Sequence, residues 1–268
     1  RMDFGVYRQT EYNMVILKGS VTMSGHSKWN NIKRKKEKTD AAKAKVFTKI
    51  GREISVIVKT GGANPNENSK LKDAIAKAKA ANVPNENIER IIKKAAGDGE
   101  ANNYEELIYE GYGPSGVAVV VETLTDNRNR TAGEMRHYFD KCGGNLGQSG
   151  SVMFMFDRKG IIQIEAEGLD EDTVMEAALE AGADDFNFDG DVFEISTDPN
   201  ELGTVRDALE KAGYSFLSAE VEYVPQTMST IEDEETAAKM EKLIDMLEEN
   251  DDVQNVYHNW SMPEDIDE

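Results

Sequence analysis

Residues 161–224 read IIQIEAEGLDEDTVMEAALEAGADDFNFDGDVFEISTDPNELGTVRDALEKAGYSFLSAEVEYV, an alternation of strand-like and helix-like apolar patterns. Ile161–Glu165 is short and apolar, as in a buried strand, whereas Asp170–Ala181 has apolar residues at helical spacing. Asp189 and Gly190 form a dipeptide typical of β-hairpins, so we expect a short strand on each side of it.

Further elements complete this unit on both sides. Asp198 opens a second helix, and Ser215–Val224 has the composition of a final strand. Ahead of the unit, Val152–Phe156 is predicted as a strand that turns back at Asp157–Gly160. The predicted order is ββαββαβ, a complete α+β domain over residues 150–225.

The segment before this domain looks like half of another one. Tyr104–Tyr109 and Val117–Leu124 read as strands, and a helix is predicted to begin at Thr131, with Glu134 completing a capping box. Two strands and one helix cannot enclose an apolar core by themselves.

The segment after this domain supplies the missing half. A linker at Pro225–Asp233 leads to a helix over Glu234–Glu249 and a strand over Val253–Trp260. We therefore expect residues 101–149 and 226–262 to form one discontinuous domain, into which the unit described above is inserted.

The head domain, residues 23–100, has a different pattern. Apolar residues recur every three to four positions in three runs that end near Gly61, Asn82 and Gly97, which predicts a small helical bundle. The expected fold class is therefore multidomain α+β: an N-terminal helical bundle followed by two ferredoxin-like α+β domains, the last inserted into the middle one. Outside these domains, residues 1–22 are interpreted as a leader or cloning remnant, and residues 263–268 as an acidic tail.

The composition is that of a globular protein. The chain has 268 residues, of which 39% are hydrophobic, and no apolar run approaches the roughly 20 residues of a membrane span. A single cysteine, Cys142, cannot form an internal disulfide, which favours a reducing compartment and a cytoplasmic location, with no contact to membranes.

Charge is distributed unevenly along the chain. The formal net charge is −20, yet Met23–Gly97 contains 18 Lys and Arg against 7 Asp and Glu. Asp98–Glu268 contains 10 against 42. A basic head on an acidic body would orient the molecule on a polyanion and hold the body away from it.

The basic segment, Met23–Lys38, reads MSGHSKWNNIKRKKEK and combines six cations with an aromatic ring at Trp29. Phosphate neutralisation and base stacking are both available there, although the run could equally be a solvated helix end with Trp29 in a core. We predict that this segment and the first helix bind nucleic acid. The candidate residues are His26, Ser27, Lys28, Trp29, Lys33, Arg34, Lys35, Lys36, Lys38, Lys45 and Lys49.

A second candidate contact is the loop TDNRNRT at residues 125–131. It leads from a strand end to a helix N-terminus, where backbone N–H groups favour anions, and it carries Asn127, Arg128 and Arg130. The alternative, slightly favoured, is that its arginines are tied to nearby acids.

Other motifs point to structure rather than chemistry. Gly111, Gly113 and Gly116 match GxGxxG but open a strand, whereas a dinucleotide site needs a helix there. Residues 185–196 begin like a calcium loop but end in Ser196 where a bidentate Glu is required. We expect no catalytic residues, metal site, cofactor or small-molecule substrate.

Five stretches together resemble one known family: GHSKW at 25–29, KVFTKIGREI at 45–54, YEGYGPSG at 109–116, TDNRNRT at 125–131 and KCGGNLGQSGSV at 141–152. They are similar to the YebC proteins, bacterial proteins once described as probable transcriptional regulators, with a mitochondrial relative that activates translation of a cytochrome oxidase subunit. The resemblance implies three domains and no enzyme activity.

The resemblance also implies one of two nucleic-acid roles. One is control of transcription at promoter DNA, and the other is a ribosome-associated factor that helps translation through consecutive prolines. Lysine-rich surfaces suit folded RNA better than reading of base edges, so we favour ribosomal RNA or tRNA as the partner. A monomer is expected.

Overall fold

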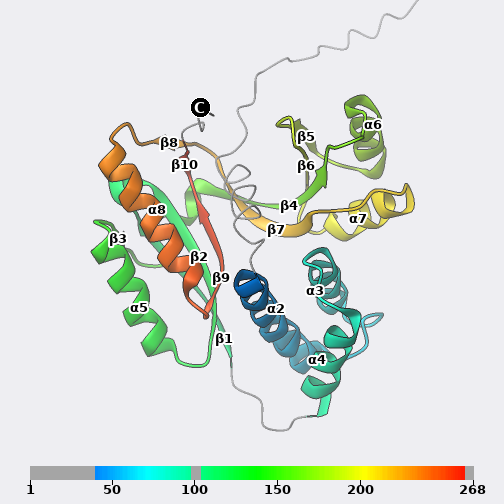
Figure 1. The fold of residues 1–268 in the computed structure, drawn as a ribbon, viewed down its shortest axis with the longest axis horizontal. Helices are drawn as coiled ribbons and strands as arrows, with labels where there is room; N and C mark the ends of the chain where they lie inside the picture. The colour runs from blue at the N-terminus through cyan, green and yellow to red at the C-terminus, as the bar shows by residue number, and fades with distance from the viewer. Residues whose placement is uncertain (1–39, 98–103, 263–268) are drawn as a thin grey trace, which may run out of the picture.

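The computed structural model describes residues 40–97 and 104–262. The head domain contributes three helices, which enclose one apolar core centred on Ile54, Leu71 and Ala78 (Figure 1). The predicted helical bundle is confirmed. Its helices are α2 (Asp40–Gly61), α3 (Ser69–Ala80) and α4 (Asn85–Gly97).

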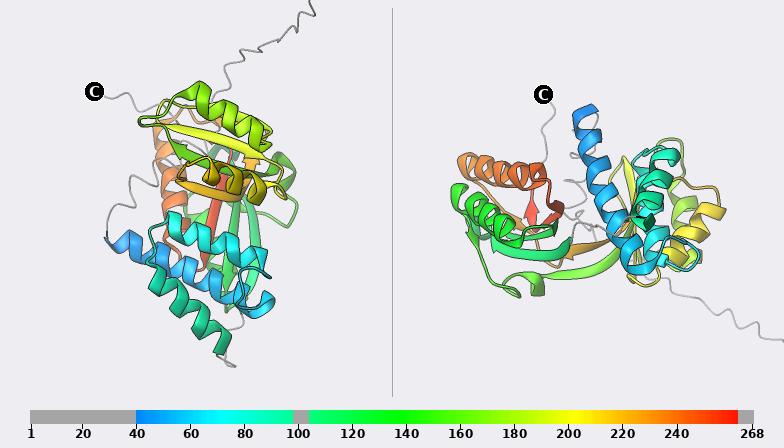
Figure 2. Two further views of the ribbon diagram at one scale, coloured as in Figure 1. Left: turned by 90° about the vertical axis from the view of Figure 1, so that its right-hand side faces the viewer. Right: turned by 90° about the horizontal axis from the view of Figure 1, so that it is seen from below.

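The middle, discontinuous domain contains a four-stranded sheet in the order β3-β1-β2-β9. Its elements are β1 (Glu105–Tyr112), β2 (Ala118–Thr125), α5 (Arg128–Lys141), β3 (Asn145–Leu146), α8 (Glu234–Glu249) and β9 (Val253–His258). Because β9 pairs with β2, segments separated by more than a hundred residues share one sheet. Helices α5 and α8 lie side by side on one face of it (Figure 2).

The central strand β2 is buried on both faces. Val119 and Val121 pack toward α5 and α8, whereas Val120 packs on the opposite face against Val152 and Phe156. A two-stranded parallel pair, β8 (Ser229–Thr230) and β10 (Trp260–Ser261), lies beside this sheet.

The inserted domain has the order β5-β6-β4-β7 with antiparallel neighbours and two helices, the connectivity of ferredoxin-like folds. Its elements are β4 (Phe156–Glu165), α6 (Glu171–Ala181), β5 (Asp185–Phe188), β6 (Val192–Thr197), α7 (Leu202–Lys211) and β7 (Ser218–Pro225). Strands β4 and β7 pair along their length, so that Phe156 faces Pro225 where the chain enters and leaves the domain. The multidomain α+β class is confirmed.

Two local predictions are wrong. Residues 152–156 do not form a strand that turns at 157–160. Met153–Met155 is a 3-10 turn, and β4 runs unbroken from Phe156, because the buried carboxylate of Glu110 accepts backbone hydrogen bonds from Gly150, Val152 and Met153 at 2.6–2.9 Å.

The second error concerns the start of α5. Thr131 is not its N-cap: Asn127 caps the helix, with its side-chain oxygen accepting from the Arg130 N–H at 3.1 Å. The hydroxyl of Thr131 is instead buried in a polar network, and the Glu134 carboxylate accepts from Asn250 at 2.8 Å rather than from the backbone.

The glycines of the GxGxxG match are required by the local structure. A Cβ on Gly111 would lie 2.7 Å from a Phe139 ring carbon, and one on Gly113 would lie 2.6 Å from the Met240 sulfur. Gly116 has φ +75 in the turn between β1 and β2. Close packing and turn geometry therefore account for all three. None of the helices in the two described ranges has the length and apolarity to cross a bilayer.

Candidate nucleic-acid interface

Two of the predicted binding lysines lie against the body of the protein. The ammonium of Lys49 donates to the backbone oxygen of Glu248 at 2.9 Å, and that of Lys45 donates to the backbone oxygen of Glu249. These oxygens belong to the last turn of α8, where a helix has unpaired carbonyl groups and a partial negative charge. Lys45 and Lys49 thus cap a helix of the neighbouring domain.

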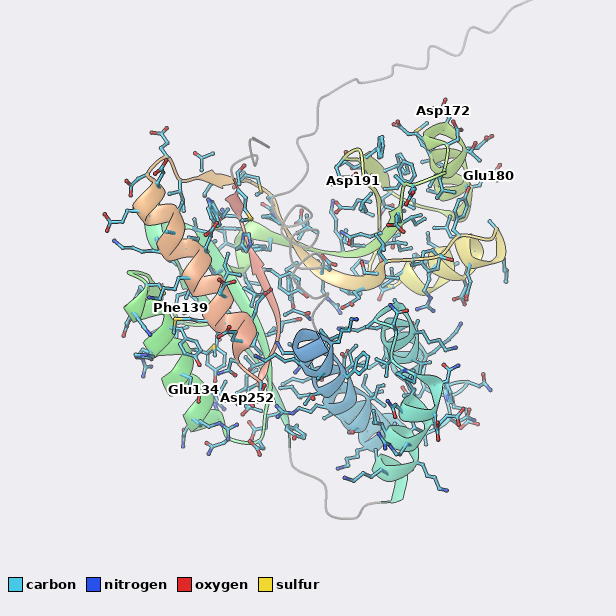
Figure 3. All side chains as sticks on the ribbon, viewed as in Figure 1. Glu134, Phe139, Asp172, Glu180, Asp191 and Asp252 are labelled. Atoms are coloured by element: carbon cyan, nitrogen blue, oxygen red, sulfur yellow. The ribbon has the colours of Figure 1, made fainter. Side chains whose placement is uncertain are left out.

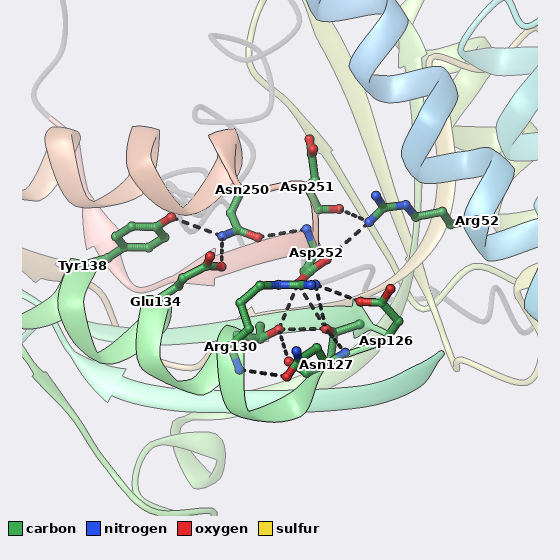
Figure 4. A network of polar contacts seen from close by, with 11 residues as sticks. Arg52, Asp126, Asn127, Arg130, Glu134, Tyr138, Asn250, Asp251 and Asp252 are labelled. Carbon is green, nitrogen blue, oxygen red and sulfur yellow. Dashed lines mark hydrogen bonds and ion pairs between the residues drawn. The ribbon is translucent and has the colours of Figure 1, made fainter. Parts of the chain in front are cut away.

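Arg52, one turn further along α2, extends the same contact. Its guanidinium donates to the backbone oxygen of Asp251 at 2.8 Å and lies 3.3 Å from the Asp252 carboxylate (Figure 4). Asp252 is the residue directly before β9 and is 5% exposed. The basic face of α2 is therefore directed at the turn between α8 and β9.

Asp252 is the centre of the polar network in Figure 4. One carboxylate oxygen accepts from Arg130 at 2.7 Å, from Thr131 at 2.8 Å and from Thr125 at 3.0 Å. Burial alone would raise the pKa of Asp252, but these hydrogen bonds outweigh it and hold the pKa below its ordinary value. The carboxylate is thus kept charged.

The network engages one of the two arginines of the 125–131 loop, although both side chains are exposed. Arg130 pairs with Asp252 and also with Asp126 at 2.9 Å. For this residue the structure therefore agrees with the alternative stated above, in which an arginine of the loop is tied to nearby acids. Arg128 and Asn129 are exposed, at the first turn of α5. Of the loop residues, Arg128 is the cation best placed to meet an external phosphate.

A cleft of about 450 Å³ lies beside this network. Five carboxylate side chains and only two guanidinium groups line it, so it would repel an anion. The other lining side chains are Tyr104, Tyr138 and Asn250.

Helix α3 fastens the head domain to the inserted domain. The Lys77 ammonium lies 2.7 Å from the carboxylate of Glu220 in β7 and 3.3 Å from that of Glu53 in α2. Burial alone would lower the pKa of Lys77, yet the two carboxylates raise it well above its ordinary value. Arg206 of α7, 4% exposed, reaches back to Asp73 at 2.7 Å.

These interdomain pairs lie beyond local sequence reasoning. Acids near the head lysines in sequence are few, but the pairing acids come from residues more than a hundred positions away. The only indication in the sequence was the separation of charge itself, because a lysine-rich segment and an acid-rich segment of one chain attract each other. Within residues 43–97 the exposed cations are Lys43, Lys59, Lys70, Lys72, Lys79, Arg90, Lys93 and Lys94, and of these Lys72 pairs with Asp207 of α7.

Most of the predicted binding residues lie outside the described residues. His26, Ser27, Lys28, Trp29, Lys33, Arg34, Lys35, Lys36 and Lys38 all precede Asp40, as does the 1–22 leader, and the 263–268 tail follows the last described residue. Their assignment as nucleic-acid contacts stays a prediction.

Two family models together cover most of the chain. The N-terminal domain of the TACO1/YebC protein matches residues 27–98, and the second and third domains match residues 104–260. The chain belongs to the TACO1/YebC family.

Curated relatives of this YebC-family chain agree over nearly their whole length. A "Probable transcriptional regulatory protein" of Acetivibrio thermocellus is 63% identical over 239 residues, covering 89% of this chain and 99% of the relative. A protein of the same description from Clostridium novyi is 58% identical over 246 residues, covering 91% and 100%. A crystal structure of a conserved hypothetical protein from Aquifex aeolicus superposes with a TM-score of 0.78 at 49% identity, covering 85% of this chain and 94% of the other.

Proposed function

We propose that this YebC-family protein is a non-enzymatic nucleic-acid-binding regulator of gene expression that works on the ribosome. In this proposal the basic segment contacts ribosomal RNA or tRNA, and the protein relieves stalls such as those at consecutive prolines. The observation that carries the proposal is the separation of charge: 18 cations against 7 acids over residues 23–97, and 10 against 42 beyond them.

Contacts with other domains remove several cations from this role. Lys45, Lys49, Arg52, Lys72 and Lys77 face other domains, so the proposed contacts are the basic segment, Arg128 and the other exposed lysines of α3 and α4. The acidic remainder would be repelled by phosphate, which limits contact to the head and the start of α5.

A second candidate is a DNA-binding transcriptional regulator, favoured by the names of the curated relatives. A protein that reads the major groove usually presents Arg, Asn or Gln from a recognition helix to the base edges. Lysines dominate the exposed cations of the head, which supports phosphate binding on folded RNA instead.

Co-sedimentation with ribosomes and gel shift on promoter DNA, each across a salt series, distinguish the two. Changing the four cations of residues 33–36 to Gln should flatten the salt dependence of ribosome binding, by roughly one unit for each phosphate that is no longer neutralised. Lys45→Gln with Lys49→Gln is the matched control and should leave the slope nearly unchanged. Sequence-specific duplex binding at physiological salt without ribosome binding would favour the second candidate.

A further inference from the structure

The inserted domain has an unpartnered helix face with exposed apolar side chains. Met175 and Leu179, four residues apart on α6, are 37% and 55% exposed, and Leu169 just before the helix is 41% exposed. Among the described residues six large apolar side chains are exposed, and four of them, these three and Phe188, lie between β4 and β6. Such clustering of exposed apolar groups marks an interaction surface.

The buried face of α6 supplies the contacts that the helix makes with the core of the inserted domain. Val174 and Ala178 point into the domain core at 1% and 0% exposure. Asp170 caps the helix by accepting from the Thr173 N–H at 3.0 Å. Met175 and Leu179 therefore add nothing to the core and remain available to a partner.

The sequence segment that carries this apolar row has charge of one sign. Residues 161–205 contain fourteen Asp and Glu but no Lys, Arg or His. On α6 itself, Asp172, Glu176 and Glu180 follow one another at four-residue spacing and are exposed, beside the row of Met175 and Leu179. Figure 3 shows Asp172 and Glu180 projecting from the outer side of α6.

This face lies on the side of the inserted domain that is away from helices α2, α3 and α4. In Figure 1 and in the left view of Figure 2, α6 lies at the edge of the inserted domain, and α7, β7 and α3 lie between it and the rest of the head. A partner on α6 would thus not compete with nucleic acid bound to the exposed lysines of α3 and α4.

We propose that the α6 face, formed by Leu169, Met175, Leu179 and the flanking acids, docks a lysine- and arginine-rich protein segment that carries apolar side chains. Apolar anchors of the segment would cover Met175 and Leu179, and its cations would pair with the acidic row. The same acids repel nucleic acid and an identical copy of this face, which leaves a cationic protein as the occupant.

The test uses the full chain and a synthetic 16-residue helical peptide of Lys, Leu and Ala, labelled for fluorescence anisotropy. Met175→Ser with Leu179→Ser should weaken binding by about tenfold or more, because apolar anchors carry most of the affinity of such contacts. Ile108→Ser, at an exposed apolar residue on β1, is the matched control and should not change it. The variants should fold, because these side chains lie outside the core, and thermal melting checks this.

Four results would overturn the proposal. The first is equal binding by the double variant and the control, and the second is equal affinity for a Lys and Ala peptide without Leu. The third is concentration-dependent self-association, measured by light scattering, that the double variant abolishes, because the occupant would then be a second copy of the chain. The fourth is binding of single-stranded RNA to this face. A peptide in which Glu replaces every Lys should not bind.

Discussion

Replacing Lys77 should loosen the head from the inserted domain. Its ammonium joins carboxylates of two domains, Glu220 at 2.7 Å and Glu53 at 3.3 Å, with 19% of the side chain exposed. In Lys77→Met the carboxylates keep their charges but lose the cation between them. Removing one partner of a fully buried pair costs 3–5 kcal/mol and of a surface pair at most about 1, so we expect about 2 kcal/mol here.

The measurement is a thermal melt beside that of Lys79→Met. Lys79 lies in the same last turn of α3 but is exposed, so its replacement removes a lysine and leaves the interdomain pairs in place. A destabilisation of about 2 kcal/mol corresponds to roughly 4–8 °C for a body of this size. Hydrogen exchange should become faster in α3 and β7 of the Lys77 variant only.

A double variant checks the physical cause. Lys77→Met with Glu220→Gln should recover part of the lost stability, because one of the two uncompensated charges is removed and only that of Glu53 remains, whereas Lys79→Met with Glu220→Gln should not improve on Lys79→Met. Equal melting temperatures for the two single variants would refute the reasoning, and so would a lack of recovery in the double variant.

Three further changes test other contacts. Asp252→Asn should cost about 2 kcal/mol at neutral pH, since charged hydrogen bonds are removed. The folded-state pKa of Asp252 lies below its ordinary value, so the stabilisation by its carboxylate is present above that ordinary value and disappears as the pH falls through the folded pKa. The melting temperatures of the two proteins should therefore converge below about pH 4. A constant difference between them would contradict this. Asn127→Ala should cost about 1 kcal/mol because the N-cap is removed, and it should speed hydrogen exchange in the first turn of α5, while Asn129→Ala should change stability by less than about 0.5. Gly111→Ala should cost about 1–3 kcal/mol in denaturant unfolding, because its Cβ would lie 2.7 Å from a backbone oxygen of β3, whereas Gly133→Ala, with nothing within 4 Å, should stabilise α5 by up to about 1.

Local periodicity was enough to predict most of the helices and the class of the fold. The spacing of apolar residues predicted the three head helices, and the Asp189–Gly190 hairpin is observed between β5 and β6. The first half of β4 was missed because Asp157–Gly160 has the composition of a turn, and only pairing with β7 makes it extended. Tertiary pairing thus overrode local preference.

The candidate site was harder to predict, because it depends on pairs between distant residues. Nothing near Lys45, Lys49 or Lys77 in sequence reveals that the end of α8 and Glu220 lie opposite them. The place of the arginine loop was easier to predict, because the sequence shows a strand end followed by a helix start. Its acidic partner Asp252 was not predicted, because it comes from a turn more than a hundred residues later.

The way in which the inserted domain is attached has an evolutionary consequence. Phe156 and Pro225 face each other as neighbours on adjacent strands, so everything between them is joined to the rest of the chain by one narrow two-stranded stem. A cassette attached in this way can be exchanged while the host sheet keeps its strand pairing, provided that the replacement keeps the charged partners of α3 on α7 and β7. Relatives of this protein could therefore acquire new protein partners by replacing the contiguous block that carries α6, far from those pairs in sequence.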